Sequence, residues 1–172
     1  MECLIISDSH GSEQELEEVI ERHRSSVDAI FHCGDSELKQ SSSILRHTYP
    51  VQGNVDIPGE FPEDRTEEVK GIRVYITHGH LYNIKMTHVP LSYRAEEKGA
   101  RMACFGHSHV PTAFEENGVI FVNPGSLLQP RSRPDQTYAI ASFDTNGGAE
   151  IRFLERKSGE ELRDLYQSFP KQ

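Results

Sequence analysis

The chain of 172 residues has no tryptophan, only three cysteines and no long apolar run. Cys3, Cys33 and Cys104 cannot all pair, and none belongs to a Cys-x-x-Cys motif. This usage favours reduced, buried thiols over a disulfide framework or a thiolate zinc site. The longest apolar runs, such as 3–6 and 138–141, are far shorter than the roughly 20 residues of a membrane-spanning helix. The first residues also lack the basic start and cleavage site of a signal peptide, so we expect a cytoplasmic protein.

Basic residues are scarce as well. The chain has 18 Lys and Arg against 27 Asp and Glu, which gives a net charge of −9. No basic stripe offsets this charge, so the sequence argues against long nucleic acids and acidic membranes as partners. Any anionic ligand must instead be held by groups gathered at one site, and not by a basic surface. Length and composition predict one globular domain over residues 1–172, and they leave the oligomeric state open.

Strand and helix signals alternate along the first half of the chain. The expected strands are 2–7, 28–33, 48–52, 72–77 and 101–105. The expected helices are one that begins at a capping box of Ser12 and Glu15, a weak one over 37–47, and one over 88–98. Such alternation predicts parallel strands joined by crossover helices, as in an α/β fold.

The pattern becomes antiparallel after residue 109. Strands over 110–115 and 119–123 flank Asn117-Gly118, a dipeptide typical of hairpin turns. A second hairpin is expected from 136–144 and 149–155. A last helix is expected over 158–168, again from a capping box.

Side chains that can bind metal follow five of the expected strands, at their carboxyl ends. They are Asp8, His10, Asp35, Asn54, His78, His107 and His109. In open α/β sheets the crevice beyond these strand ends is where ligands bind, so the loops should converge. Because residues two apart in extended backbone point the same way, the two side chains of each Asp-x-His or His-x-His pair should enter one cleft.

Two carboxylates in one cleft repel each other unless cations compensate, which indicates a metal site. Seven candidates exceed the three or four ligands of one open metal centre, so two ions about 3.5–4 Å apart are expected. Mixed nitrogen and oxygen donors favour Mn²⁺, with Zn²⁺, Fe²⁺ or Ni²⁺ as alternatives, over Ca²⁺ and Mg²⁺. Two divalent ions, two aspartates and a bridging hydroxide sum to a charge of about +1, which suits a small phosphate ester.

Together these blocks resemble the signature of a known family. Asp8-Ser9-His10, Gly34-Asp35, Gly53-Asn54, His78-Gly79-His80 and Gly106-His107-Ser108-His109 are similar to the five motifs of the calcineurin-like metallophosphoesterase superfamily, in the family's order. Asn123-Pro124-Gly125-Ser126 extends the likeness to its small bacterial and archaeal phosphodiesterase branch, whose fold is similar to that of vacuolar sorting protein 29. The resemblance implies an α/β fold, a four-layer α-β-β-α sandwich of two mixed sheets.

The resemblance also implies roles for the candidate side chains. Asp8, His10 and His109 would bind the first ion, and Asn54, His78 and His107 the second. Asp35 would bridge them. The implied activity is hydrolysis of a phosphate ester, more specifically a diester, by a hydroxide held between the ions, with Asp35, Asn54 and His78 at the reaction centre.

One position departs from the pattern of many family members. Where they have a histidine that protonates the leaving group, this chain has Val55-Asp56. Loss of such a general acid can cost roughly 10²–10⁴-fold for a poor leaving group. The phosphodiesterase branch is similar in lacking this histidine, so the departure indicates a subfamily.

Other residues and functions stay open at this stage. Arg131 and Arg133 are candidates for binding substrate phosphate, and His80 for orienting a metal ligand. The remaining histidines are expected to be structural: His23, His32, His47 and His88. The rival functions are a metal-binding scaffold on the same fold, without hydrolysis, and a nuclease, against which the net charge argues.

Overall fold

The computed structural model describes residues 1–171 and contains two mixed β-sheets. The first sheet has six strands. Their order across the sheet is β11 (Gln167–Phe169), β10 (Ala149–Glu155), β9 (Thr137–Phe143), β1 (Glu2–Ile6), β2 (Ala29–His32) and β3 (Tyr49–Pro50). β1, β2 and β3 run parallel, and β9 joins β1 antiparallel. The amino-terminal strand therefore lies at the centre of this sheet.

The second sheet has five strands. Their order is β4 (Asp64–Val69), β5 (Ile72–Thr77), β6 (Met102–Cys104), β8 (Val119–Asn123) and β7 (Thr112–Glu116). β5, β6 and β8 are parallel, and the two edge strands are antiparallel to their neighbours.

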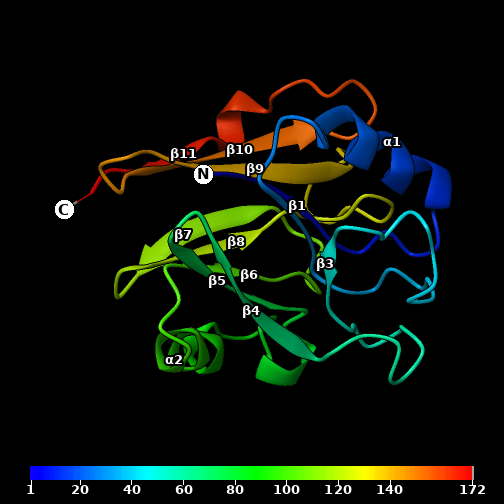
Figure 1. Cartoon of the computed structure of the whole chain (residues 1–172), viewed down its shortest axis with the longest axis horizontal. Helices are drawn as coiled ribbons and strands as arrows, with labels where there is room; N and C mark the ends of the chain where they lie inside the picture. The colour runs from blue at the N-terminus through cyan, green and yellow to red at the C-terminus, as the bar shows by residue number, and fades with distance from the viewer. Residues whose placement is uncertain (172) are drawn as a thin grey trace.

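The two sheets stack face to face, with one helix outside each (Figure 1). α1 (Glu13–His23) covers the outer face of the six-stranded sheet, and α2 (Val89–Glu97) covers that of the five-stranded sheet. The described chain also contains two short 3₁₀ helices, η1 (His80–Tyr82) and η2 (Arg163–Leu165). The expected four-layer α-β-β-α sandwich is confirmed.

Alternating side chains of the strands supply the cores between these layers. In β1, Ile5 points between the sheets and packs with Ile76 and Val122, whereas Leu4 points outward to Ile20 of α1. A third cluster buries α2 against the five-stranded sheet. Each such side chain contributes about 1.5–3 kcal/mol on burial, so the layers hold the strand ends, and the loops that follow them, in fixed positions.

The expected hairpins are confirmed. Asn117 and Gly118 have φ of 50° and 79°, the left-handed values that a two-residue hairpin turn needs. Lys70 and Gly71 form a similar turn, with φ of 50° and 80°, between β5 and β4. β4 was not expected, because its sequence is largely polar and only its last residue, Val69, is buried.

Two expected helices are wrong. Residues 37–47 form a series of turns, because Glu37 and His47 adopt left-handed φ of 58° and 64°, which a right-handed α-helix does not contain. Residues 158–168 form a β-bridge at Glu161, then η2 and part of β11, since pairing along the sheet edge satisfies this backbone.

The first capping box is also absent, although α1 begins where expected. The Ser12 hydroxyl donates to the Ser9 carbonyl over 2.5 Å instead of capping the helix. Within residues 1–171, no helix combines the length and the apolar character needed to cross a bilayer.

Candidate metal centre

The loops after β1, β2, β5 and β6 meet beyond the carboxyl ends of these strands, and they bring two overlapping groups of ligand atoms together. We call Asp8, His10 and His109 the outer trio, and Asp8, Asp35 and His78 the inner trio. Within each trio the candidate ligand atoms all lie within 4.8 Å of one another. Asp8 belongs to both, so the two groups form one continuous site.

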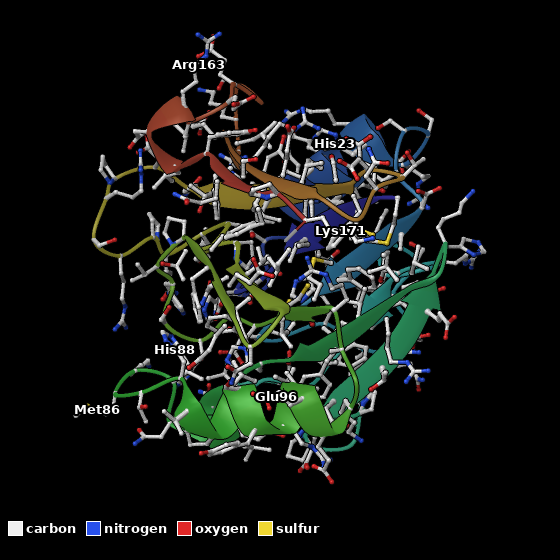
Figure 2. The ribbon with its side chains drawn as sticks, turned by 90° about the vertical axis from the view of Figure 1, so that its left-hand side faces the viewer. His23, Met86, His88, Glu96, Arg163 and Lys171 are labelled. Atoms are coloured by element: carbon white, nitrogen blue, oxygen red, sulfur yellow. The ribbon has the colours of Figure 1, made fainter. Side chains whose placement is uncertain are left out.

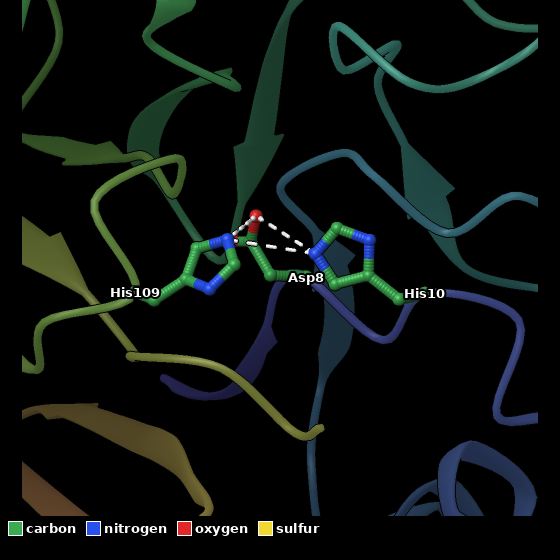
Figure 3. A group of neighbouring side chains, drawn as sticks. All are labelled: Asp8, His10 and His109. Atoms are coloured by element: carbon green, nitrogen blue, oxygen red, sulfur yellow. Dashed lines mark hydrogen bonds and ion pairs between the residues drawn. The ribbon is translucent and has the colours of Figure 1, made fainter. Parts of the chain in front are cut away.

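The outer trio joins residues that are about a hundred positions apart in the chain (Figure 3). Asp8 Oδ1 lies 3.0 Å from His109 Nε2 and 3.9 Å from His10 Nε2. The two imidazole Nε2 atoms are 3.5 Å apart. Two nitrogens and one carboxylate oxygen thus converge on one point.

The inner trio is more deeply buried. Asp35 Oδ2 lies 3.2 Å from His78 Nε2, and Asp8 Oδ1 lies 3.9 Å from the same nitrogen. The Asn54 side-chain oxygen joins this group at 3.1 Å from His78 Nε2. Hydrogen bonding to His78 and its positive charge outweigh the cost of burial and lower the pKa of Asp35 to about 2.

Each imidazole of the two trios is oriented through its other ring nitrogen. His78 Nδ1 donates to the Cys33 carbonyl and His109 Nδ1 to the Gln129 carbonyl, both over 2.7 Å. His10 Nδ1 instead lies 2.9 Å from a Glu37 carboxylate oxygen. With Nδ1 engaged in this way, each imidazole presents Nε2 to the site, and loss of the Nε2 proton to a bound cation gives the arrangement of a metal-ligating histidine.

Asp8 carries the clearest sign that the site suits a cation. Its Oδ2 accepts from the Ser7 hydroxyl over 2.6 Å and from the His107 amide over 3.1 Å. Its Oδ1 is buried and accepts no hydrogen bond within residues 1–171. Burial opposes ionisation, but His109 and His78 outweigh it and hold the pKa of Asp8 below its ordinary value. A buried anionic oxygen that faces three imidazole nitrogens fits a divalent ion of the kind that binds mixed nitrogen and oxygen donors.

His107 and His80 lie beside the inner trio without belonging to it. The His107 ring centroid is 5.1 Å from that of His78, and the His80 centroid is 5.3 Å from it. Burial and the positive charge of His78 lower the pKa of His107 to about 4, so this imidazole is a neutral donor at pH 7. His80 forms no hydrogen bond through its buried Nδ1 in the described chain, so its expected contact to a ligand is not seen.

The backbone of the site is strained, and here the sequence argument was wrong. Both members of each two-apart pair were expected in extended backbone. Asp8, His10, Asp35, His107 and His109 all have left-handed φ, between 44° and 66°. Such residues cost of order 1–3 kcal/mol each and persist where the surrounding structure holds them. The pairs enter the site because tight turns aim them there.

Two glycines allow the loops that carry the ligands to pack closely against each other. A Cβ at Gly106 would overlap the Ser7 hydroxyl, and a Cβ at Gly53 would overlap the Asp35 carboxylate. Neither glycine has a left-handed φ. Their role is therefore to let two ligand loops approach each other.

Asp56 is a positioning residue that the sequence did not reveal. It is buried, and its carboxylate accepts from the backbone amides of Asp35, Gly53 and Glu37 over 2.8, 2.7 and 2.6 Å. The Ser36 hydroxyl adds a fourth hydrogen bond, over 3.2 Å. One carboxylate thus ties the Asp35 loop to the Asn54 loop.

The Asn-Pro-Gly-Ser block has a similar role on the opposite side. Asn123 donates to the Gly106 carbonyl over 2.8 Å, and the Ser126 hydroxyl donates to the Asp8 carbonyl over 2.7 Å. These bonds position the loop of His107 and His109 against that of Asp8. The block therefore supports the site without entering it.

The two candidate arginines lie in different surroundings. Arg133 pairs with Asp135 at 2.7 Å and Asp164 at 3.0 Å, so its charge is neutralised away from the site. Arg131 lies beside the centre, where its amide donates to the His109 carbonyl over 3.2 Å. Cys104 is fully buried, and burial raises the pKa of its thiol well above the ordinary value, as expected of a structural cysteine.

Residues 1–146 match the family model described as the calcineurin-like phosphoesterase superfamily domain. The chain belongs to this family. It is 42% identical over 165 residues to the probable metallophosphoesterase YsnB of Bacillus subtilis, covering 96% of each chain. Membership identifies a phosphoesterase-type hydrolase domain that uses divalent metal ions.

Two solved structures have a fold similar to that of this chain. The crystal structure of a conserved Streptococcus pneumoniae protein, named a predicted phosphoesterase, superposes with a TM-score of 0.94 at 36% identity, over 99% of this chain and 97% of that one. Vps29 of Entamoeba histolytica in complex with Zn²⁺ gives a TM-score of 0.73 at 17% identity, over 98% of both chains. At that identity the second likeness concerns the fold alone.

Proposed function

We propose that this domain hydrolyses a small phosphodiester with two divalent ions, of which Mn²⁺ is the favoured metal. The observation that carries the proposal is the pair of overlapping trios around the buried Asp8 oxygen that accepts no hydrogen bond in the described chain. Asp8, His10 and His109 would hold one ion, and Asn54, His78 and His107 the other. Asp35 would lie between them, as the family pattern implies.

The charges of the centre favour an anionic substrate. Two divalent ions in such a site supply an activated water molecule and neutralise charge on the phosphoryl oxygens. The protein contributes two carboxylates there, so the loaded centre stays positive although the chain carries −9 overall. Asn54, with its carboxamide beside His78, is placed to donate a hydrogen bond to a phosphoryl oxygen.

The leaving group receives little help from the Asn54 loop. Val55 stands where many relatives have a histidine, and Asp56 cannot replace it as an acid. All four hydrogen bonds to Asp56 are accepted by its carboxylate, so both oxygens are engaged by the surrounding loops and neither is free to face a leaving group. This supports esters whose leaving oxygen needs little protonation, such as aryl diesters. An alkyl leaving oxygen, such as a ribose hydroxyl, must take its proton from solvent.

The competing function is a metal-binding scaffold without hydrolysis. Vps29 proteins share the fold, so the fold alone does not decide between the two functions. The intact set of seven candidate ligands supports the enzyme, because a scaffold does not require a complete set.

Chelator-treated protein, reloaded with Mn²⁺, tests the proposal on bis(p-nitrophenyl) phosphate and on p-nitrophenyl phosphate. We expect hydrolysis only after metal is restored, with the diester preferred. Asp35→Ala is the inactive variant, and its circular dichroism checks the fold. Activity that ignores chelation would contradict the metal mechanism. Full metal loading with no turnover of either ester would favour the scaffold.

A further inference from the structure

A groove of about 380 Å³ opens beside the metal centre. It reaches the centre at Ser108, the residue between His107 and His109. Its volume lies within the range of about 300–1,000 Å³ seen for small-molecule sites. This is far more room than one phosphoryl group needs, so the groove suits the organic part of a substrate.

Two cations without carboxylate partners line the groove. Lys85 and Arg131 are both exposed, and within residues 1–171 neither side chain forms an ion pair or a hydrogen bond. Most other arginines are paired, as Arg101 is with Glu115 at 3.2 Å. Both cations line the groove together with Ser108, so their charges face the space beside the metal centre.

The body of the groove is apolar and aromatic. Ile84 and Phe105 line it together with His88. The His88 ring packs on Phe105 at 5.6 Å and on Phe114 at 4.9 Å between centroids, and burial lowers the pKa of His88, so the ring is neutral at pH 7. Figure 2 shows His88 on the loop that leads into α2, with Met86 projecting outward nearby. A flat apolar group fits such a wall.

We propose that this groove binds the leaving group of the substrate, and that this group carries an aromatic or apolar body and a second anion held by Lys85 and Arg131. A nucleoside monophosphate is an example of that chemistry. The inference rests on the proposed phosphodiesterase function and narrows its substrate class. Hydrolysis consumes one water: its oxygen bonds to phosphorus, the bond from phosphorus to the leaving oxygen breaks, and that oxygen takes up a proton.

The alternative is that both cations hold the phosphoryl group under attack. The volume of the groove argues against this, as does the positive charge that the ions already supply there. The two placements differ in a measurable way. Cations on the attacked phosphoryl group would promote hydrolysis of every diester equally, whereas cations on the leaving group would favour only substrates with the second anion.

The test compares two dinucleotides, diadenylate with and without a 5′-phosphate, on the manganese-loaded protein. The variants are Lys85→Gln and Arg131→Gln. Arg46→Gln and Lys157→Gln are matched controls, because both residues are exposed and lie outside the groove lining. We expect kcat/KM to favour the phosphorylated dinucleotide by about tenfold or more, and each groove variant to lose most of that preference. The controls should keep it.

A binding measurement separates this inference from the proposed function. With chelator present, calorimetry should show adenosine 5′-monophosphate binding the full chain about tenfold more weakly in each groove variant. Equal losses on both dinucleotides, or a preference unchanged by the variants, would overturn the inference and leave the phosphodiesterase intact. If no ester is hydrolysed at all, the proposed function fails, and monophosphate binding unaffected by the variants then overturns the groove as well.

Discussion

The two trios of the metal centre differ in what holds them. In the inner trio, His78 is oriented by the Cys33 carbonyl, and Asp35 Oδ1 accepts from the Val55 amide over 3.0 Å. Both contacts come from main-chain groups. In the outer trio, His10 is oriented by the side chain of Glu37, which is 44% exposed. Main-chain groups therefore orient the inner trio. In the outer trio they orient His109, through the Gln129 carbonyl, whereas His10 depends on a surface side chain.

This difference teaches that the two ion positions should not be equivalent. Backbone partners preorganise a ligand, because their positions follow from the packed sheets. A surface carboxylate has rotamer freedom that must be lost each time it orients its histidine. We expect the ion at the inner trio to bind more tightly and to exchange more slowly.

The largest effect should come from the carboxylate proposed to serve both ions. Asp35→Ala should lower diester hydrolysis by about 10³-fold and remove both ions, since each loses a ligand. Metal content per chain, measured by elemental analysis beside activity, checks this. Asp164→Ala, at an exposed position, is the control. If Asp35→Ala keeps one ion while Asp8→Ala loses both, the shared ligand is Asp8.

The next effect concerns the support of the inner trio. Asp56→Ala would leave three backbone amides and one hydroxyl without their acceptor. We expect the free energy of unfolding to fall by about 3 kcal/mol or more, and activity to fall with it as the Asp35 loop shifts. Urea denaturation of the metal-free protein measures the loss. Asp56→Asn keeps one acceptor oxygen and should lose less; equal stability of all three proteins would refute the positioning role.

A smaller effect should mark the outer trio. Glu37→Gln should weaken Mn²⁺ binding at one of two sites by about 10–100-fold, because the carboxylate no longer polarises His10. Manganese titration followed by calorimetry would show one weakened site and one unchanged. Glu17→Gln, on the exposed side of α1, is the matched control. If Mn²⁺ affinity fell equally at both sites, the proposed difference between the two trios would be contradicted.

The smallest effect is a pH dependence of the folding stability, which comes from His32, a buried histidine close to the metal centre. His32 is buried, with Nε2 2.9 Å from the Ser9 hydroxyl, and burial lowers its pKa to about 4. Between about pH 6.5 and pH 4 the unfolded chain binds a proton that the folded chain does not, so stability falls as the pH drops through this window. We expect His32→Gln, which keeps a donor for Ser9, to reduce this loss by about 1–2 kcal/mol at pH 5. Urea denaturation at pH 7 and pH 5, in chelator, compares the two proteins; parallel losses would contradict the assignment.

Much of this molecule could be predicted from its sequence. The continuous apolar run of β1 and the Asn117-Gly118 turn identified their elements, because these signals are local. The ligand set could be proposed because the motifs follow strand ends, which meet at one edge of a sheet. The helix expected over 37–47 was wrong because contacts from Asp56, distant in sequence, hold that loop open.

The sequence by itself determined most of the strands and the chemical identity of the candidate ligands, since apolar patterns and residue type are written along the chain. The layers were expected only from the resemblance to a known family. Only the tertiary structure decided how those ligands are held: the left-handed turns at Asp8 and Asp35, the acceptor role of Asp56, and the side-chain tether of His10. The physical reason is that a hydrogen-bond partner is chosen by distance in space, and loops without periodic patterns carry no local signal of what the packed sheets will bring beside them.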